Sequence, residues 1–210
     1  MMKKIILASA SPRRAALLRQ LGLCFDVVES GVCEDLDEKD PMRLAEQLAL
    51  AKAKAVAANV AEGVVIAADT VVCADGELLG KPQNPAEAAA MLRLLSGRRH
   101  DVLTGVAVIS RPQNISSVHV EKTAVVMRAI TEDEITWYVA SGEPFDKAGG
   151  YGIQGRAAVF VEKLNGCYFN VVGLPLASLW RMLAEHGIRI WEGAECHDIT
   201  APDHQGFAPE

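Results

Sequence analysis

The stretch Ile5-Ile6-Leu7-Ala8-Ser9-Ala10-Ser11-Pro12-Arg13-Arg14 predicts a β-strand that turns directly into an α-helix. Residues 5–8 form a short apolar run that is typical of a buried strand. Ser11 suits the N-cap position, and Pro12 suits the first helical position because its missing N–H would have no partner there. The leucines that follow recur at helical spacing until Gly22, which predicts the end of the helix.

The start of this helix also predicts a binding site for an anion. Free N–H groups and the positive end of the helix dipole lie there, next to the hydroxyls of Ser9 and Ser11. Arg13 and Arg14 add two guanidinium groups, which bind phosphate especially well. The alternative is an ordinary capped helix with two solvated arginines, and this segment by itself does not decide between the two.

Strand and helix patterns alternate along the rest of the chain. Helices are expected over residues 41–59, 84–96, 131–141 and 175–187, and strands over residues 25–28, 64–73, 100–110 and 117–129. The strand over 64–73 is expected to be interrupted at Asp69-Thr70, and residues 158–164 and 167–172 are expected to form a hairpin around Asn165-Gly166. These elements predict a mixed sheet with flanking helices, in an α/β or α+β fold, rather than a purely parallel sheet.

The length of 210 residues suits one domain or two small lobes. We expect a single domain over residues 1–191. Residues 192–210 show no apolar periodicity, and we expect this polar tail to be disordered.

The composition argues against several classes of function. The formal net charge of −6 disfavours binding along a nucleic-acid backbone, which requires a basic surface. No stretch reaches the roughly 18 apolar residues of a membrane span. The five cysteines are odd in number and lack C-x-x-C spacing, so we expect free thiols in a reducing cytoplasm rather than a disulfide framework or a zinc site. An acidic chain can still bind a small polyanion where its cations converge on one cleft.

Asp69 is the strongest single candidate for chemistry. It follows the apolar run Val64-Val65-Ile66-Ala67-Ala68, where a carboxylate has little reason to lie unless it is paired, bound to a metal or catalytic. Ligands gather at strand ends in sheets that helices surround, and we expect Asp69 at such an end. A structural aspartate in a turn or bulge is the alternative.

Two lysines are candidates for binding phosphate. Lys52 lies four residues after Leu48, at the edge of an apolar helical stripe, whereas Lys54 points away from it. A half-buried lysine needs an acidic partner or a ligand phosphate, but a lysine on a solvated rim is equally common. Lys81 follows Gly80 in a segment that resembles a P-loop without matching its spacing, so by itself it is an exposed loop lysine.

Glu34 is the candidate partner of Asp69. It belongs to an acidic run over residues 34–38, most of which we expect to be a solvated loop. Because Glu34 lies nearest the preceding strand, it could hold a divalent cation together with Asp69. Hard carboxylate oxygens favour Mg²⁺ or Mn²⁺.

The loop over residues 146–155 carries four glycines in ten residues. Glycines permit unusual backbone angles and a close approach to a ligand. Gln154 in this loop could read the edge of a nucleotide base, because its amide offers one acceptor and one donor group. A merely flexible loop is the alternative.

Together and in this order, these segments resemble the Maf family of nucleoside triphosphate pyrophosphatases. The matching segments are Ser9-x-Ser11-Pro12-Arg13-Arg14, Lys52-Ala53-x-Ala55, Ala68-Asp69-Thr70-Val71-Val72, Gly80-Lys81-Pro82, Leu95-Ser96-Gly97-x-x-His100 and Asp146-Lys147-Ala148-Gly149-x-Tyr151-Gly152-Ile153-Gln154-Gly155. The resemblance covers roughly residues 3–190. It implies an elongated α/β fold with two lobes around a central cleft, similar to inosine triphosphate pyrophosphatases.

The resemblance also implies the reaction. Such an enzyme cleaves a nucleoside triphosphate between its α- and β-phosphates, which limits excess or non-canonical nucleotides. The Tyr151-Gly152-Ile153-Gln154 form of the loop resembles the branch that acts on dTTP and UTP. By the same resemblance, Asp69 is the proton acceptor, and Arg13, Thr70 and Gln154 set the base specificity. Cys33 departs from the pattern, because its position is often acidic in the family, and this bears on the metal site rather than on the reaction.

The residues and the resemblance lead to one hypothesis. Asp69 would activate water, and a Mg²⁺ or Mn²⁺ ion on Asp69 and Glu34 would neutralise part of the triphosphate charge. The rest of that charge would be neutralised by Arg13, Arg14, Lys52 and Lys81. Two alternatives stay open, a nucleotide-binding regulator of cell division without activity and a pyrophosphatase for modified purine triphosphates. We expect a cytoplasmic location without nucleic-acid or membrane partners, and a homodimer is left open.

Overall fold

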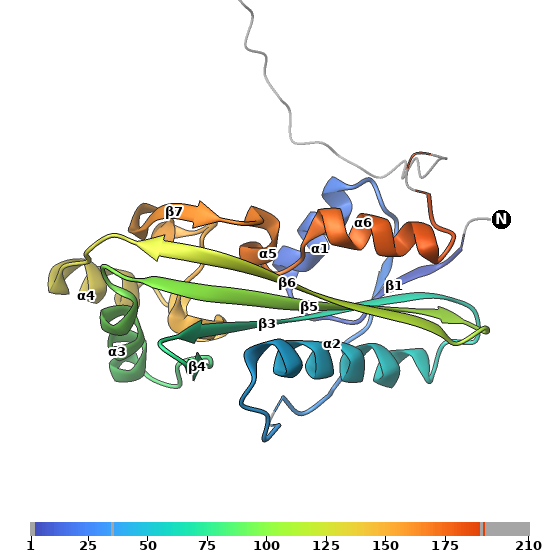
Figure 1. Cartoon of the computed structure of the whole chain (residues 1–210), viewed down its shortest axis with the longest axis horizontal. Helices are drawn as coiled ribbons and strands as arrows, with labels where there is room; N and C mark the ends of the chain where they lie inside the picture. The colour runs from blue at the N-terminus through green and yellow to red at the C-terminus, as the bar shows by residue number, and fades with distance from the viewer. Residues whose placement is uncertain (1–2, 35, 190, 192–210) are drawn as a thin grey trace, which may run out of the picture.

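The computed structural model describes residues 3–34, 36–189 and 191, and its centre is a seven-stranded mixed sheet (Figure 1). The strands follow the order β2-β1-β3-β5-β6-β7, and β4 pairs with β3 outside this path. β1 is parallel to β2 and β3, whereas the other pairs are antiparallel. The bounds are β1 (Ile5–Leu7), β2 (Asp26–Val27), β3 (Gly63–Ala74), β4 (Glu77–Leu79), β5 (Arg99–Arg111), β6 (Ile115–Met127) and β7 (Val161–Asn165). The predicted mixed sheet of the α/β class is confirmed.

Helices cover both faces of the sheet (Figure 1). α2 lies on one face, α1, α5 and α6 lie on the other, and α3 and α4 pack at one end. The bounds are α1 (Pro12–Gln20), α2 (Pro41–Ala57), α3 (Pro85–Leu95), α4 (Glu132–Ala140), α5 (Tyr168–Val172) and α6 (Leu176–Glu185), with short 3₁₀ helices η1 (Glu143–Asp146), η2 (Ala148–Gly150) and η3 (Arg156–Phe160). Asp40 caps α2 by accepting hydrogen bonds from the backbone N–H groups of Met42 and Arg43. Thr131 and Glu134 form the predicted capping box of α4.

β3 is buried on both faces, which explains its continuous apolar sequence. Val64, Ile66 and Ala68 belong to the apolar cluster beneath α1 and α6. Val65 and Ala67 belong to the cluster beneath α2, on the opposite face. Alternate residues of one strand thus serve two layers of core.

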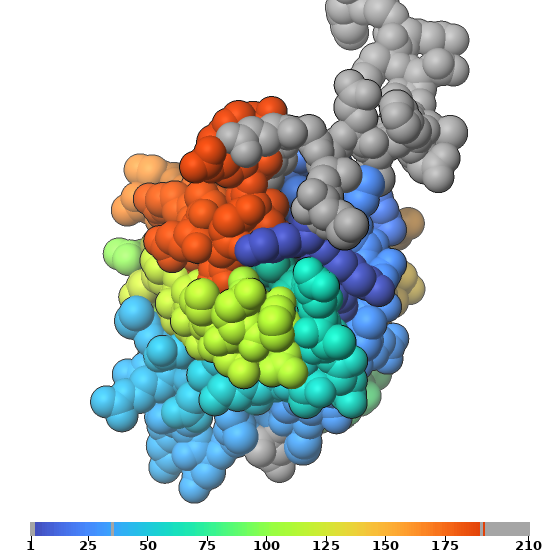
Figure 2. Space-filling model, turned by 90° about the vertical axis from the view of Figure 1, so that its right-hand side faces the viewer, coloured from blue at the N-terminus to red at the C-terminus, as the bar shows by residue number. Residues whose placement is uncertain are grey.

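A further apolar cluster joins α3 and α4 to the sheet at its far end, around Leu92, Tyr138 and Phe160. The surface at the opposite end is formed by four segments that lie side by side (Figure 2). They are the start of β1, the start of β3, the β5–β6 turn and α6. The apolar cluster at the α3–α4 end is separate from the clusters beneath α1, α6 and α2. No helix within the described residues is long and apolar enough to cross a membrane.

The predicted interruption of the strand at Asp69-Thr70 is wrong. Asp69 pairs with Gly105 of β5, and Thr70 pairs with Thr104, so β3 continues through both residues. Pairing with a neighbouring strand depends on residues far away in the sequence, and here it outweighs the low strand propensity of an aspartate.

The predicted hairpin around Asn165-Gly166 is also wrong. Residues 161–165 form β7, but Tyr168–Val172 form the helix α5 instead of a returning strand. The apolar, β-branched run predicts a strand locally. The side chain of Asn170, however, donates hydrogen bonds to the Val102 carbonyl and the Thr123 hydroxyl at 2.9 Å each, which ties the helix to the sheet.

Two other expectations concern cysteines and the end of the chain. Cys33, Cys73 and Cys167 have free thiols, whereas Cys24 is disulfide-bonded, so the prediction of free thiols is wrong at Cys24. The predicted disorder of residues 192–210 falls outside the described residues.

Candidate active site

The edge of β3 is open along a short segment. β1 pairs with β3 only at Val64–Ile66, and β4 pairs with it only at Val72–Ala74. Between them, residues 67–71 have a neighbouring strand of the described chain, β5, on one side only. The prediction that Asp69 lies at a strand end is therefore wrong. Asp69 lies within β3, beside a gap in the edge of the sheet.

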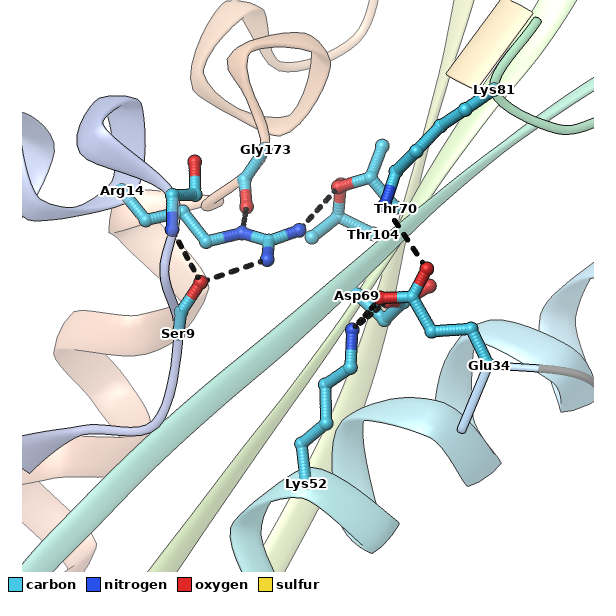
Figure 3. A network of polar contacts seen from close by, with 10 residues as sticks. Ser9, Arg14, Glu34, Lys52, Asp69, Thr70, Lys81, Thr104 and Gly173 are labelled. Carbon is cyan, nitrogen blue, oxygen red and sulfur yellow. Dashed lines mark hydrogen bonds and ion pairs between the residues drawn. The ribbon is translucent and has the colours of Figure 1, made fainter. Parts of the chain in front are cut away.

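Asp69 and Thr70 project to opposite faces of the sheet at this gap, because neighbouring side chains of a strand alternate. Figure 3 shows that Lys52 from α2 reaches Asp69 on one face, whereas Arg14 from α1 reaches Thr70 on the other. At this gap, side chains from both faces of the sheet lie close to one another.

A cavity of about 470 Å³ opens here, within the usual size range of small-molecule sites. Of the predicted site residues, all but Ser9 line it: Ser11, Arg13, Arg14, Glu34, Lys52, Asp69, Thr70, Lys81 and Gln154. Residues from six separate segments of the sequence thus meet around one space.

A buried ammonium group joins two carboxylates in the cavity (Figure 3). Lys52 donates from Nζ to Asp69 Oδ1 at 2.5 Å and to Glu34 Oε1 at 2.6 Å. The side chains of Lys52 and Asp69 are only 9% and 10% exposed, so Lys52 is not a lysine on a solvated rim. Lys81 donates to the other carboxylate oxygen of Glu34 at 3.1 Å.

Glu34 is held as a carboxylate by these two lysines. Its partial burial would raise the pKa, but the hydrogen bonds and positive charges of Lys52 and Lys81 outweigh this and lower the pKa of Glu34 to about 2. Glu34 therefore carries its negative charge at neutral pH.

Arg14 is held by the protein on three sides. Its Nε donates to the Gly173 carbonyl at 2.8 Å, and its two terminal nitrogens donate to Ser9 Oγ at 3.2 Å and Thr70 Oγ1 at 3.1 Å. Burial lowers the pKa of Arg14 from its ordinary value. The described residues thereby engage three of the five N–H groups of the guanidinium and leave two for a ligand.

Ser9 and Ser11 have different places. Ser9 Oγ accepts hydrogen bonds from Arg14 and from the backbone N–H of Ser11, so it supports the start of α1 and does not line the cavity. Ser11 takes the predicted N-cap position, but its side chain makes no capping hydrogen bond and instead lines the cavity.

Asp146 links two cations that line the cavity. Its carboxylate accepts from Arg13 at 2.9 Å and from Lys147 Nζ at 2.5 Å. Lys147 also donates to the Glu143 carbonyl at 2.7 Å, and its side chain is only 15% exposed. Lys147 lines the cavity and is missing from the predicted set, although the acid–base pair Asp146-Lys147 inside a glycine-rich loop was a signal that could have identified it.

The glycine-rich loop is anchored through Tyr151 rather than Gln154. The Tyr151 hydroxyl and His100 Nε2 lie 2.6 Å apart in the core, and burial lowers the pKa of His100 to about 4, against a smaller opposing effect of Asp101. His100 is therefore neutral near pH 7. Gln154 is exposed at the cavity, and no hydrogen bond of its side chain to another described residue is found.

The carboxylates of Asp69 and Glu34 are the only predicted metal ligands. No group of three or more His, Cys, Asp or Glu that could hold a metal occurs among the described residues. Two carboxylates nonetheless suit Mg²⁺, which commonly binds one or two carboxylates and completes its shell with water and substrate phosphates. Cys33, next to Glu34, is exposed and does not line the cavity.

Comparison with known proteins adds independent information. Residues 4–186 match the family model described as Maf-like protein. The chain is 51% identical over 191 residues to the dTTP/UTP pyrophosphatase of Moorella thermoacetica, covering 90% of this chain and 98% of that one. It is 53% identical over 185 residues to the dTTP/UTP pyrophosphatase of Deinococcus radiodurans, covering 88% and 94%.

Two solved structures are similar to part of the chain at lower levels. A nucleoside-triphosphatase / dITP/XTP pyrophosphatase from Mycobacterium abscessus matches 60% of this chain and 75% of its own, with a TM-score of 0.40 and 20% identity. The Ham1 protein of Staphylococcus aureus matches 60% of this chain and 72% of its own, with a TM-score of 0.41 and 19% identity.

Proposed function

The chain belongs to the family of Maf-like proteins, and on that premise we propose that it is a nucleoside triphosphate pyrophosphatase acting on dTTP and UTP. It hydrolyses the anhydride between the α- and β-phosphates and releases a nucleoside monophosphate and pyrophosphate. The relatives that support this substrate are about half identical to the chain and cover nearly all of it. The observation that carries the chemistry is the buried Lys52 ammonium between Asp69 and Glu34 at the gap in β3.

The cations of the cavity bind the triphosphate. Arg14 contributes the two N–H groups that the protein leaves unused, and Lys81 contributes an ammonium group on an accessible side chain. Arg13 adds a second guanidinium to the lining of the cavity. These groups are preorganised by their protein partners, so they stabilise the charge that spreads over the phosphoryl oxygens during cleavage.

Asp69 is the proton acceptor for the attacking water. Its Oδ1 is bonded to Lys52, which fixes the direction of the carboxylate and leaves Oδ2 for the water. The water transfers a proton to Asp69 while its oxygen attacks one phosphorus of the α–β anhydride, in line with the bridging oxygen. The bond between that phosphorus and the bridging oxygen breaks, and the two products are the nucleoside monophosphate and pyrophosphate. Lys52 orients the carboxylate of Asp69 through this hydrogen bond.

A Mg²⁺ or Mn²⁺ ion would be held by Glu34 and Asp69 together with substrate oxygens. Bound there, it would supply further positive charge to the phosphates. Lys81 and Lys52, which now neutralise Glu34, are then available for phosphate oxygens.

Gln154, Thr70 and Arg13 set the base specificity in this proposal. Gln154 lies in the loop that Tyr151 anchors, and its amide is free to pair with the base. The activity belongs in the cytoplasm, and neither a nucleic acid nor a membrane is needed as a partner. Sedimentation analysis of the purified chain would establish whether it forms a homodimer.

The test is the release of pyrophosphate from a panel of triphosphates in Mg²⁺ and in Mn²⁺. We expect dTTP and UTP to be cleaved with the highest kcat/KM among dTTP, UTP, CTP, ATP, GTP and dITP. A preference for dITP or another modified purine triphosphate would instead identify a pyrophosphatase for modified purine triphosphates. Binding without turnover of any triphosphate would identify a nucleotide-binding regulator.

A further inference from the structure

The hydroxyl of Thr70 belongs to a chain of hydrogen bonds that runs from α1 through the neighbouring strands β3 and β5 to α5. Arg14 donates to Thr70 Oγ1 at 3.1 Å, and Thr70 Oγ1 lies 2.9 Å from Thr104 Oγ1 (Figure 3). Thr104 in turn donates to the backbone carbonyl of Asn170 at 2.9 Å. Thr104 is fully buried, and it does not line the cavity.

The direction of this chain follows from counting protons. A threonine hydroxyl has one proton and two lone pairs. The proton of Thr104 goes to the Asn170 carbonyl, so Thr104 must accept the proton of Thr70. One lone pair of Thr70 accepts from Arg14, and the second lone pair remains.

Thr70 can therefore offer a substrate an acceptor but no donor. Phosphate oxygens at neutral pH are themselves acceptors, so they cannot be the partner of this hydroxyl. The ring N3 of uracil and thymine carries a hydrogen, whereas the ring N3 of cytosine carries a lone pair. A lone pair of Thr70 attracts the first and repels the second.

We propose that Thr104 is a positioning residue that fixes the Thr70 hydroxyl as an acceptor for the N3–H of uracil and thymine, and thereby disfavours cytosine. The inference rests on the proposed function and deepens its base specificity. The amide N–H of Gln154 is then left for a neighbouring carbonyl of the base. Thr104 touches no substrate and acts only through the proton of Thr70.

The surroundings place Thr70 and Thr104 next to each other. Thr70 and Thr104 are direct partners in the register of β3 and β5. A Cβ at Gly173, whose φ is +118°, would lie 3.4 Å from Thr70 Oγ1 and 3.6 Å from Arg14 Nε, so the backbone of Gly173 lies beside the pair. The hydroxyl of Thr70 has little freedom to point elsewhere while Thr104 accepts from it.

The experiment uses Thr104→Val, which keeps the shape of the side chain but removes the acceptor. The proton of Thr70 is then free to donate to cytosine N3. The Asn170 carbonyl keeps a second donor, the backbone N–H of Gly173 at 3.0 Å. We expect the ratio of kcat/KM for CTP to kcat/KM for UTP to rise about tenfold, and Thr104→Ser to restore the original ratio.

Ser110→Ala is the matched control, because it removes another buried hydroxyl from β5, one that bonds to His186 and does not line the cavity. It should leave the ratio unchanged. An equal loss for UTP and CTP in Thr104→Val would mean that Thr104 is merely structural and would overturn the inference.

Two further measurements separate the remaining explanations. With 2′,3′-dideoxy-UTP and 2′,3′-dideoxy-CTP, Thr104→Val should show the same shift in the ratio of kcat/KM. A shift that disappears with these substrates would place Thr70 at the sugar and overturn the assignment to N3.

Equilibrium binding of UMP and CMP gives the same discrimination without turnover. If the unmodified protein binds UMP over CMP and Thr104→Val narrows that preference, the inference stands even where the proposed hydrolysis fails. If Thr104→Val does not fold, Thr70→Val should lose the preference for UMP, and an intact preference would refute the inference.

Discussion

Gly105 lies directly opposite Asp69 in the register of β3 and β5, and the space of its missing side chain is filled by the backbone of α2. A Cβ at Gly105 would lie 2.1 Å from the carbonyl oxygen of Ala45, which no real structure tolerates. The glycine thus lets α2 approach the sheet at the level of the site. This approach brings Lys52, later in the same helix, to within 2.5 Å of Asp69.

The first prediction is that Gly105→Ala weakens both the fold and the site. α2 must move away from the sheet, and overpacking of this kind lowers the free energy of unfolding by about 1–3 kcal/mol. Urea denaturation measures the loss. Gly80→Ala is the control for stability, because a Cβ at Gly80 meets nothing within 4 Å, and an equal loss in both variants would contradict the explanation.

Asp69→Asn should retain the fold and the binding of nucleotide but lose most turnover. Lys52 keeps Glu34 as its charged partner, and an amide at residue 69 cannot accept a proton from water. We expect kcat to fall by about 10²–10⁴-fold. Pyrophosphate release and isothermal titration together test this, and a variant that retains more than about a third of normal turnover is incompatible with Asp69 as the base.

Lys81→Ala should weaken turnover far more than stability. Its side chain is 49% exposed and lies at the cavity, so it contributes little to the fold and much to phosphate binding. Lys54→Ala is the matched control, since Lys54 is an exposed lysine of α2 that does not line the cavity. Steady-state kinetics and denaturation of both variants decide, and equal activity in the two would remove Lys81 from the phosphate site.

The acid stability of the protein should depend on Glu34. The pKa of Glu34 falls from its ordinary value of 4.5 to about 2 in the folded chain, so its stabilising effect is present above the higher value and is lost as the pH falls toward the lower one. The difference in unfolding free energy between the unmodified protein and Glu34→Gln should therefore shrink between about pH 6 and about pH 3. Denaturation curves at several pH values measure it, and a constant difference would argue against the ion pairs with Lys52 and Lys81.

Gln154→Ala should lower kcat/KM for UTP and dTTP by roughly tenfold to a few hundredfold, because a paired contact with the base is lost. The difference in kcat/KM between these two substrates and CTP should become smaller, since the phosphate contacts remain. Kinetics with the three substrates test this. Equal losses for all three would assign Gln154 to support of the loop and leave base reading to Thr70 and Arg13.

Much of the fold could be predicted from local patterns. The strand–turn–helix unit at Ser9–Arg14, the helix after Asp40 and the capping box of Thr131 and Glu134 all follow from residues within one or two turns of each other. Hydrophobic periodicity and capping act over such short distances, so they can be identified directly in the sequence. The set of residues around the cavity was also predictable, but from the order of motifs rather than from any single one.

Only the tertiary structure decided how those residues meet. The sequence could not reveal that β1 and β4 leave residues 67–71 of β3 without a neighbour on one side, because strand pairing joins segments that are distant in the chain. For the same reason it predicted a strand where α5 forms, and it gave no sign of Thr104 behind Thr70 or of Gly105 beneath α2. Side-chain chemistry can be read from composition and order, whereas burial, hydrogen-bond direction and the space left by a glycine exist only once separate elements are packed together.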